Sequence, residues 1–216
     1  MNGYAANGVY KNALLLRPSS SLPRRLVGIA AACALLAGGV SVAVAEEAPA
    51  YRETNLGLYV TAKEAFELMQ HDESALLIDV RDPVEIKFTG FAEPTDIHVP
   101  WVLADRSQFD SESQTWPMAR NSDFAAQVAA ALEAHSADAD TPIIVMCRSG
   151  ATRSAPAADV ITEMGYSEVY SVSDGFEGGT LADGDSKGVR ARNGWRNSGL
   201  PWSYEINPDV AWYEAQ

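Results

Sequence analysis

The chain has 216 residues, enough for one domain with a substantial core, and its 29 acidic against 16 basic residues give a formal net charge of −13 at pH 7. This acidity argues against nucleic acid and anionic membrane surfaces as partners, because both repel a negatively charged protein. Only Cys147 follows the N-terminal segment that holds the other cysteine, Cys33, so a mature chain without that segment has no intramolecular disulfide and no two-cysteine redox relay.

The first 45 residues have the composition of a secretory signal peptide. They contain four basic and no acidic residues, and an apolar run from Leu26 ends in Ala43-Val44-Ala45. We expect cleavage after Ala45, which leaves 12 basic against 29 acidic residues and a periplasmic or otherwise exported protein. An apolar run of about 20 residues could also anchor the chain, so we expect a membrane as partner only if this segment stays uncleaved.

Beyond a linker at residues 46–55, helical and strand patterns alternate through a single expected domain at residues 56–216. Thr61 and Glu64 have the spacing of a capping box and predict the start of the first helix. The apolar run at residues 76–80 predicts a strand buried on both faces. The other expected elements are an edge strand at 58–60, a capped helix at 122–135, a strand at 143–146, a helix from Ser154 to a stop at Gly165, and a strand at 169–172. This order predicts an α/β fold with a mostly parallel central sheet and helices on both faces.

Two stretches, at about residues 104–120 and 177–193, interrupt this order and are interpreted as insertions. Part of the second resembles a calcium-binding loop, but Lys187 replaces an oxygen ligand and Gly194 stands where the last carboxylate belongs. The three histidines, His71, His98 and His135, have no metal-ligand spacing. We therefore expect neither a metal nor another cofactor.

Cys147 ends an apolar strand and begins a loop of small residues that leads into a helix. Parallel strands in such folds carry their reactive groups at the carboxyl ends, and a helix N-terminus favours both a thiolate and a bound oxyanion. Arg153 closes the loop and could bind an oxyanion through two hydrogen bonds. Cys147 is thus the expected nucleophile, and the expected substrate-binding loop consists of Arg148, Ser149, Gly150, Ala151, Thr152 and Arg153.

Five segments together resemble the rhodanese family of sulfurtransferases. They are Leu77-Ile78-Asp79-Val80-Arg81-Asp82-Pro83-Val84-Glu85, Ile97-His98-Val99-Pro100, the Cys147 loop, the strand at 169–172, and Gly194-Trp195-Arg196-Asn197-Ser198-Gly199-Leu200-Pro201. The resemblance runs from Leu56 to Trp202 and implies the rhodanese-like fold, with Asp79, Arg81 and Ser154 supporting the loop. The stretch at residues 90–96 departs from the family pattern and lacks its histidine.

The resemblance implies transfer of sulfane sulfur from thiosulfate or a persulfide, through a Cys147 persulfide, to a thiol or protein acceptor. Arg148 and Arg153 would bind the departing sulfite, and Ser149 and Thr152 would supply hydroxyl groups.

The number of residues in the Cys147 loop is also compatible with a second function. The family usually places four residues between the cysteine and the arginine, whereas this chain has five, as do cysteine-dependent phosphatases and arsenate reductases of the rhodanese fold. A phosphatase also needs a proton donor, for which Asp79 and Glu85 are candidates, although a structural ion-pair network explains both residues more simply.

A third alternative is a non-catalytic module that binds or carries sulfur for a partner. It would use the aromatic residues near the C-terminus, which are otherwise interpreted as a tail folded back on the core: Trp195, Trp202, Trp212 and Tyr213.

Overall fold

The computed structural model describes residues 53–214. The expected signal segment and residues 46–52 of the expected linker lie outside the described residues. Within residues 53–214, no helix combines the length and the apolar character that crossing a membrane requires.

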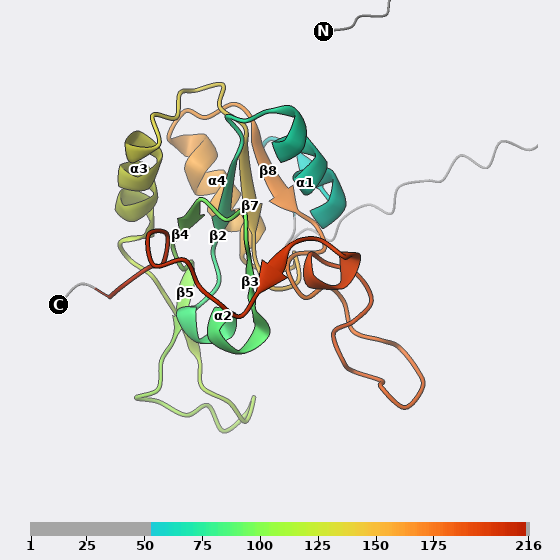
Figure 1. The fold of residues 1–216 in the computed structure, drawn as a ribbon. Coiled ribbons are helices and arrows are strands. Elements are labelled where there is room, and N and C mark those ends of the chain that lie inside the picture. The colour runs from blue at the N-terminus through green and yellow to red at the C-terminus, as the bar shows by residue number, and fades with distance from the viewer. Residues whose placement is uncertain (1–52, 215–216) are drawn as a thin grey trace, which may run out of the picture. The chain divides into compact units, whose positions relative to one another are not determined.

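A five-stranded sheet in which all neighbouring strands are parallel forms the centre of the fold (Figure 1). The expected α/β class with a parallel sheet is therefore confirmed, and the short first strand lies at the edge, as predicted. The strands, in spatial order, are β1 (Tyr59–Val60), β8 (Val169–Val172), β7 (Ile143–Met146), β2 (Leu76–Asp79) and β4 (Ile97–His98).

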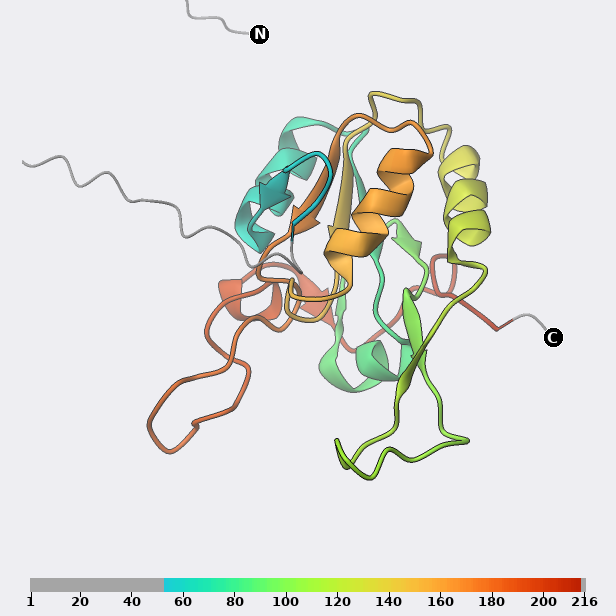
Figure 2. The same cartoon turned by 180° about the vertical axis from the view of Figure 1, so that it is seen from behind.

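Helices cover both faces of the sheet, which Figures 1 and 2 show from opposite sides. Helix α1 (Ala62–His71) buries its apolar side with Leu77, Ile144 and Met146, whereas α3 (Phe124–Ala134) and α4 (Ser154–Glu163) pack with Ile78, Ile143 and Val145. Successive side chains of β7 therefore alternate between the two cores. Cys147 continues this alternation and belongs to the core on the α3 and α4 side.

The helix predictions were right for the first helix and for the helix that begins at Ser154 and stops before Gly165, and partly wrong for the helix expected at residues 122–135. The capping box of Thr61 and Glu64 is confirmed. The helix predicted from residue 122 begins at Phe124, and its N-cap Asp123 makes no side-chain capping bond. Asn121 fixes this turn instead, because its side-chain oxygen accepts a hydrogen bond from the Asp123 amide.

A further helix, α2 (Pro83–Thr89), was not predicted. Its start has clear local signals, because Asp82 and Glu85 form a capping box and Pro83 occupies the first turn. The same residues belong to the first family motif, which draws attention to their chemistry and not to their helical signals. The helix is important for the site, because it lies at the end of the sheet at which the strands finish (Figure 1) and it contains Glu85.

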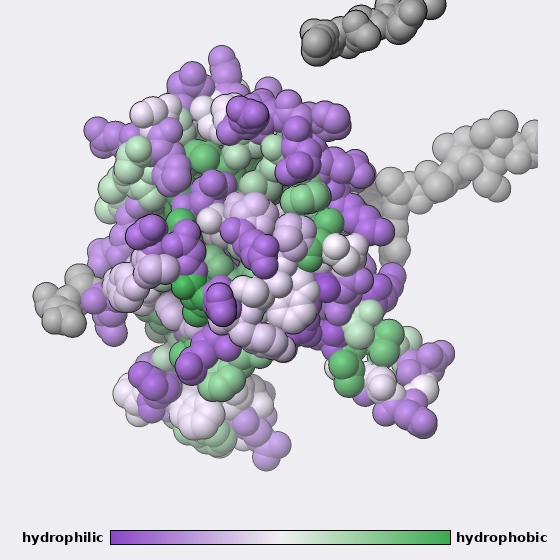
Figure 3. Space-filling view, viewed as in Figure 1, coloured by the Kyte–Doolittle hydropathy of each residue, from purple (hydrophilic) through white to green (hydrophobic). Residues whose placement is uncertain are grey.

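The two stretches interpreted as insertions project from that same end of the sheet in both views (Figures 1 and 2). In the first, β5 (Val102–Ala104) and β6 (Met118–Arg120) form an antiparallel hairpin. The second is closed by an antiparallel bridge between Thr180 and Arg190. Figure 3 shows a mostly hydrophilic face, as expected for so acidic a chain.

The C-terminal segment folds back on the core, as the sequence analysis interpreted it. It contains a short 3-10 helix (Arg196–Ser198), and β9 (Trp202–Ser203) pairs with β3 (Phe91–Ala92). Trp195 is fully buried, and the backbone amide of Trp212 donates to Nδ1 of the buried His98. Tyr213, in contrast, is 70% exposed.

Candidate active site

The site is centred on Cys147, which directly follows β7 at the carboxyl end of the sheet and is only 1% exposed. Its sulfur lies 3.5 Å from the Ser154 hydroxyl and accepts hydrogen bonds from the backbone amides of Ser149 and Ser154. Burial alone would raise the pKa of the Cys147 thiol, but the Arg153 guanidinium and these hydrogen bonds outweigh burial and lower the pKa. The geometry therefore favours a thiolate.

Ser154 links the sulfur to a second buried hydroxyl. The Ser171 hydroxyl, on β8, donates to the Ser154 oxygen at 3.0 Å, and both serines are nearly inaccessible to solvent. Ser154 can then direct its own hydrogen at the sulfur of Cys147. Ser171 was not among the predicted site residues, since an isolated serine in a strand carries no sequence signal.

The curvature of the loop depends on two glycines. Gly150 has a φ of 67°, and a side chain there would lie 2.1 Å from the carbonyl oxygen of Ser173. Gly175 has a φ of 63°, and its missing Cβ would lie 2.6 Å from both the Cys147 carbonyl oxygen and the Gly150 amide nitrogen. The amide of Phe176 holds the Cys147 carbonyl at 2.8 Å. A segment that follows β8 therefore packs directly behind the loop and fixes its shape.

Arg153 faces a carboxylate within the protein. Both of its terminal nitrogens donate to Glu85 on α2, and Arg153 Nη2 lies 2.8 Å from Glu85 Oε1. Burial opposes ionisation of Glu85, but the hydrogen bonds and charge of Arg153 outweigh it and lower the Glu85 pKa. The Arg153 charge is thus balanced by a neighbour, and the fork that could bind an oxyanion is occupied by Glu85.

A similar arrangement holds Arg148. Its Nε lies 2.5 Å from Glu177 Oε2, and the other oxygen of Glu177 lies 2.8 Å from Arg196 Nη2. Glu177 is buried between the two arginines, whereas the Arg148 side chain is 43% exposed. Arg148 can therefore present part of its guanidinium outward while its stem is fixed.

Asp79 and Arg81 form a fully buried pair behind the site. Arg81 Nη2 lies 2.5 Å from Asp79 Oδ2, and the same guanidinium donates to Thr89 Oγ1 and the Gly90 carbonyl at the end of α2. Burial opposes the Asp79 charge, but Arg81 outweighs burial and lowers the Asp79 pKa. The pair fastens the end of β2 to α2 and so supports the helix that carries Glu85.

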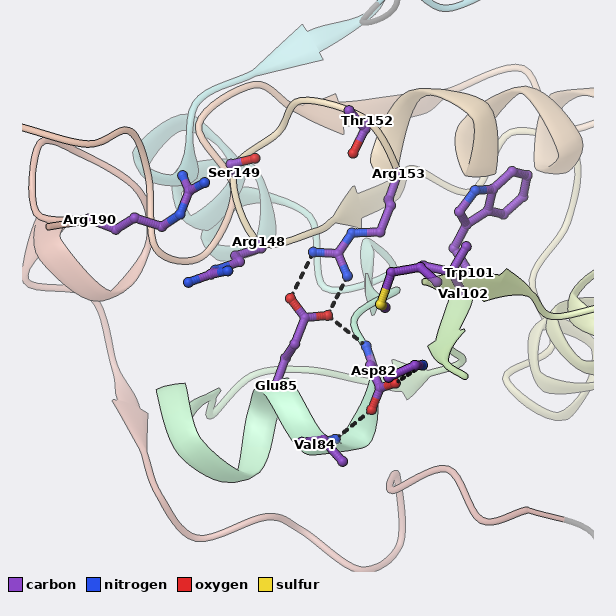
Figure 4. Close-up of a pocket in the computed structure, with 12 residues that line it drawn as sticks. Asp82, Val84, Glu85, Trp101, Val102, Arg148, Ser149, Thr152, Arg153 and Arg190 are labelled. Carbon is purple, nitrogen blue, oxygen red and sulfur yellow. Dashed lines mark hydrogen bonds and ion pairs between the residues drawn. The ribbon is translucent and has the colours of Figure 1, made fainter. Parts of the chain in front are cut away.

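A cavity of about 510 Å³ opens beside the loop (Figure 4). Four of the predicted loop residues line it, while Cys147, Gly150 and Ala151 do not. The remaining lining residues come from α2 and its N-cap, from the hairpin and the residue before it, and from the second inserted stretch; none of them is among the predicted binding residues. The lining residues are Asp82, Val84, Glu85, Trp101, Val102, Ala104, Met118, Arg148, Ser149, Thr152, Arg153 and Arg190.

The described part of the chain contains no group of three or more histidine, cysteine, aspartate or glutamate side chains arranged to hold a metal ion. His98, which is 3% exposed, contacts backbone groups instead: its Nε2 lies 2.8 Å from the Arg81 carbonyl oxygen. Its other ring nitrogen accepts a hydrogen bond from a backbone amide, so Nε2 carries the proton.

Two solved structures are similar to this chain. The crystal structure of Rv0390 from M. tuberculosis is 31% identical, with a TM-score of 0.50, and the match covers 68% of this chain and 96% of that one. The solution structure of the 30 kDa polysulfide-sulfur transferase homodimer from Wolinella succinogenes has 21% identity and a TM-score of 0.40, over 68% of this chain and 77% of that one.

Among curated proteins, the uncharacterized protein RP600 of Rickettsia prowazekii is 40% identical over 65 residues, which are 30% of this chain and 44% of that protein. The uncharacterized protein RC0915 of Rickettsia conorii is also 40% identical, over 62 residues, 29% of this chain and 42% of that protein. The match thus spans less than half the length of these curated relatives. The family model described as a rhodanese-like domain matches residues 61–182. The chain therefore belongs to the rhodanese-like domain family, which includes sulfurtransferases and also many members without catalytic activity.

Proposed function

We propose that the protein is a sulfurtransferase that moves sulfane sulfur from thiosulfate or a persulfide to a thiophilic acceptor through a persulfide on Cys147. One observation carries this proposal: a buried thiol with a lowered pKa lies in a loop whose neighbouring acids, Asp82, Glu85 and Glu177, are engaged in hydrogen bonds or ion pairs within the protein. Such a site suits a nucleophile whose leaving group needs no proton.

In the first step, the Cys147 thiolate attacks the outer sulfur of thiosulfate. A bond forms between Sγ and that sulfur, and the S–S bond of thiosulfate breaks, so that sulfite leaves with the electron pair. The negative charge of the new persulfide lies on its outer sulfur, and we expect the loop amides and the Ser154 hydroxyl, which lie at Sγ, to help stabilise it. An acceptor thiolate or cyanide then attacks the terminal sulfur and releases the Cys147 thiolate.

The acids at the cavity argue against a phosphatase. Asp82 accepts hydrogen bonds from the amides of Val84 and Ala104, both at 2.7 Å, and Glu85 is bound to Arg153. A phosphate ester commonly needs an acid that protonates its leaving oxygen, and the Glu85 pKa is lowered, which disfavours that protonated form. Since Glu85 also occupies the Arg153 fork, a phosphate or arsenate dianion would have to displace it.

We further propose that the protein acts outside the cytoplasm, on the basis of the N-terminal sequence pattern. Expression of the full chain in a bacterium, followed by fractionation and N-terminal sequencing, tests this. A periplasmic protein that begins at Glu46 supports the proposal, and a full-length protein in the cytoplasm contradicts it.

The proposed activity is tested with purified protein, thiosulfate and cyanide. We expect thiocyanate to form with multiple turnovers and to disappear in Cys147→Ser, while a chromogenic phosphate ester stays intact. Hydrolysis of the ester without thiocyanate formation would support the phosphatase instead. A Cys147 persulfide that forms but is not turned over by cyanide or by small thiols would support the sulfur-carrying module.

A further inference from the structure

The cavity beside the loop contains an arginine that the proposed reaction does not use. Arg190 belongs to the second inserted stretch and lines the same cavity as Arg148 and Arg153. Figure 4 shows Arg190 and Arg148 on one side of this cavity, with Trp101 and Val102 on the other. The second inserted stretch and the segment that leads into the hairpin of the first therefore supply different walls of one binding space.

The three arginines differ in how their charge is balanced. Arg153 is paired with Glu85 and Arg148 with Glu177. Among residues 53–214, no carboxylate lies within ion-pair distance of Arg190, although the chain has 29 acidic residues. Among the three arginines that line the cavity, Arg190 is thus the one whose positive charge is available to a ligand.

Arg190 is also held in position. Its Nη1 donates to the Gly178 carbonyl at 2.7 Å, and its backbone pairs with Thr180. The base of this stretch is tight, because the Gly179 amide donates to Asn193 Oδ1 at 2.8 Å and a side chain on Gly178 would lie 1.9 Å from the Asn193 carbonyl oxygen. The guanidinium is therefore anchored at one nitrogen, and its other donors remain for an anion.

The size and lining of the cavity indicate the kind of ligand. A volume of about 510 Å³ falls within the range of about 300–1,000 Å³ that organic ligands occupy. Thiosulfate has five heavy atoms, fills a small part of this space and gains nothing from the apolar wall of Val84, Val102 and Met118. A ligand that uses the whole cavity is an organic molecule with an anionic group.

We propose that Arg190 forms a carboxylate subsite, and that the cavity binds a low-molecular-weight organic thiol bearing a carboxylate as the acceptor of sulfur. This inference rests on the proposed function, because the acceptor reacts with the Cys147 persulfide. The acceptor thiolate attacks the terminal sulfur, a new S–S bond forms, and the bond to Cys147 Sγ breaks with its electron pair left on Cys147. The transferred sulfur keeps the negative charge that it carried on Cys147, so the acceptor leaves as a persulfide anion.

The test compares two acceptors that differ only in the carboxylate: N-acetylcysteine and N-acetylcysteine amide. The full chain is first loaded with thiosulfate or inorganic polysulfide, and mass spectrometry confirms one added sulfur atom on Cys147. Single-turnover transfer is then measured for each thiol, with rates corrected for the fraction of thiolate. We expect the carboxylate thiol to react about tenfold faster, as one charge-assisted hydrogen-bonded pair would provide.

Arg190→Gln should bring the ratio of the two rates close to one, and Arg190→Lys should give an intermediate ratio. The matched control is Arg192→Gln, since Arg192 is an exposed arginine of the same stretch that does not line the cavity. This control should keep the wild-type ratio.

A wild-type ratio near one, or a tenfold ratio that survives in Arg190→Gln, overturns the inference while the loading step still supports the sulfurtransferase. Failure of Cys147 to take up sulfur from either donor overturns both. The wild-type ratio and the Arg190→Lys variant keep the inference testable if Arg190→Gln does not fold.

Discussion

Replacement of Ser154 by alanine removes the only side-chain hydroxyl that contacts the Cys147 sulfur among the described residues. The variant should fold, because α4 has Arg153 at its N-cap with no side-chain capping bond, so no cap is lost. It should also leave the loop glycines and the Glu85 to Arg153 pair intact. The change therefore isolates one contribution to the stability of the thiolate.

The magnitude follows from the geometry. Hydrogen bonds to charged groups contribute about 1.5–3 kcal/mol, and the separation of 3.5 Å between Sγ and Oγ places this one at the weak end. A loss of about 1.4 kcal/mol lowers the ratio of thiolate to thiol tenfold at a given pH. The pKa of Cys147 should rise accordingly.

Alkylation by iodoacetamide over a range of pH measures this ratio, and peptide mapping separates Cys147 from Cys33. Below the pKa of the thiol, the alkylation rate of Cys147 should fall about tenfold in Ser154→Ala. Ser171→Ala should have a smaller effect in the same direction, because the Ser171 hydroxyl contacts Ser154 and reaches the sulfur only through it. An unchanged pH profile in Ser154→Ala would refute the assigned role of the hydroxyl.

Three further predictions concern the residues around the loop. Glu85→Gln should lower the KM for thiosulfate about fivefold, because the two terminal nitrogens of Arg153 lose the carboxylate that they now bind. Steady-state kinetics measure the KM, and an unchanged value would contradict this prediction. Gly175→Ala should destabilise the fold by about 3 kcal/mol and abolish turnover, because the new Cβ would meet the backbone of the Cys147 loop. Gly184→Ala, with a similar positive φ but open surroundings, should cost only about 1 kcal/mol. Urea unfolding compares the two variants, and equal losses would show that the contact of Gly175 with the loop does not matter. Burial lowers the pKa of His98 below its ordinary value of 6.5. As the pH drops, this histidine therefore takes up a proton in the unfolded chain before it does so in the folded protein, and the free energy of unfolding falls below pH 6.5. Between pH 7 and 5.5 the stability of the wild type and of His71→Gln should fall, and the fall should be smaller in His98→Gln. Chemical denaturation at the two pH values measures this, and an equal loss in both variants would assign it to other groups.

The α/β order and the position of Cys147 could be predicted because each depends on local signals. Apolar runs at β2 and β7, the capping box at Thr61 and the glycine-containing loop after Cys147 are all visible in the sequence. Contacts between distant residues could not be predicted in the same way. Glu85 and Arg153 are 68 positions apart and meet only because α2 packs at the end of the sheet.

The same limit applies to the cavity. Arg190 lies in a polar stretch whose composition indicates only a solvated loop, and its role depends on the bridge to Thr180 and the bond to the Gly178 carbonyl. Ser171 and Gly175 likewise act through contacts with the loop that no spacing in the sequence reveals. Their identification needed the three-dimensional packing of β8 and the segment after it.

The most direct test of the central claim is the mass of the peptide that contains Cys147 after the protein is mixed with thiosulfate. The account predicts a gain of one sulfur atom on Cys147, lost again on addition of cyanide with release of thiocyanate. A peptide of unchanged mass under conditions in which Cys147 is alkylated would show a reactive thiolate that does not accept sulfane sulfur from thiosulfate, and would contradict the account.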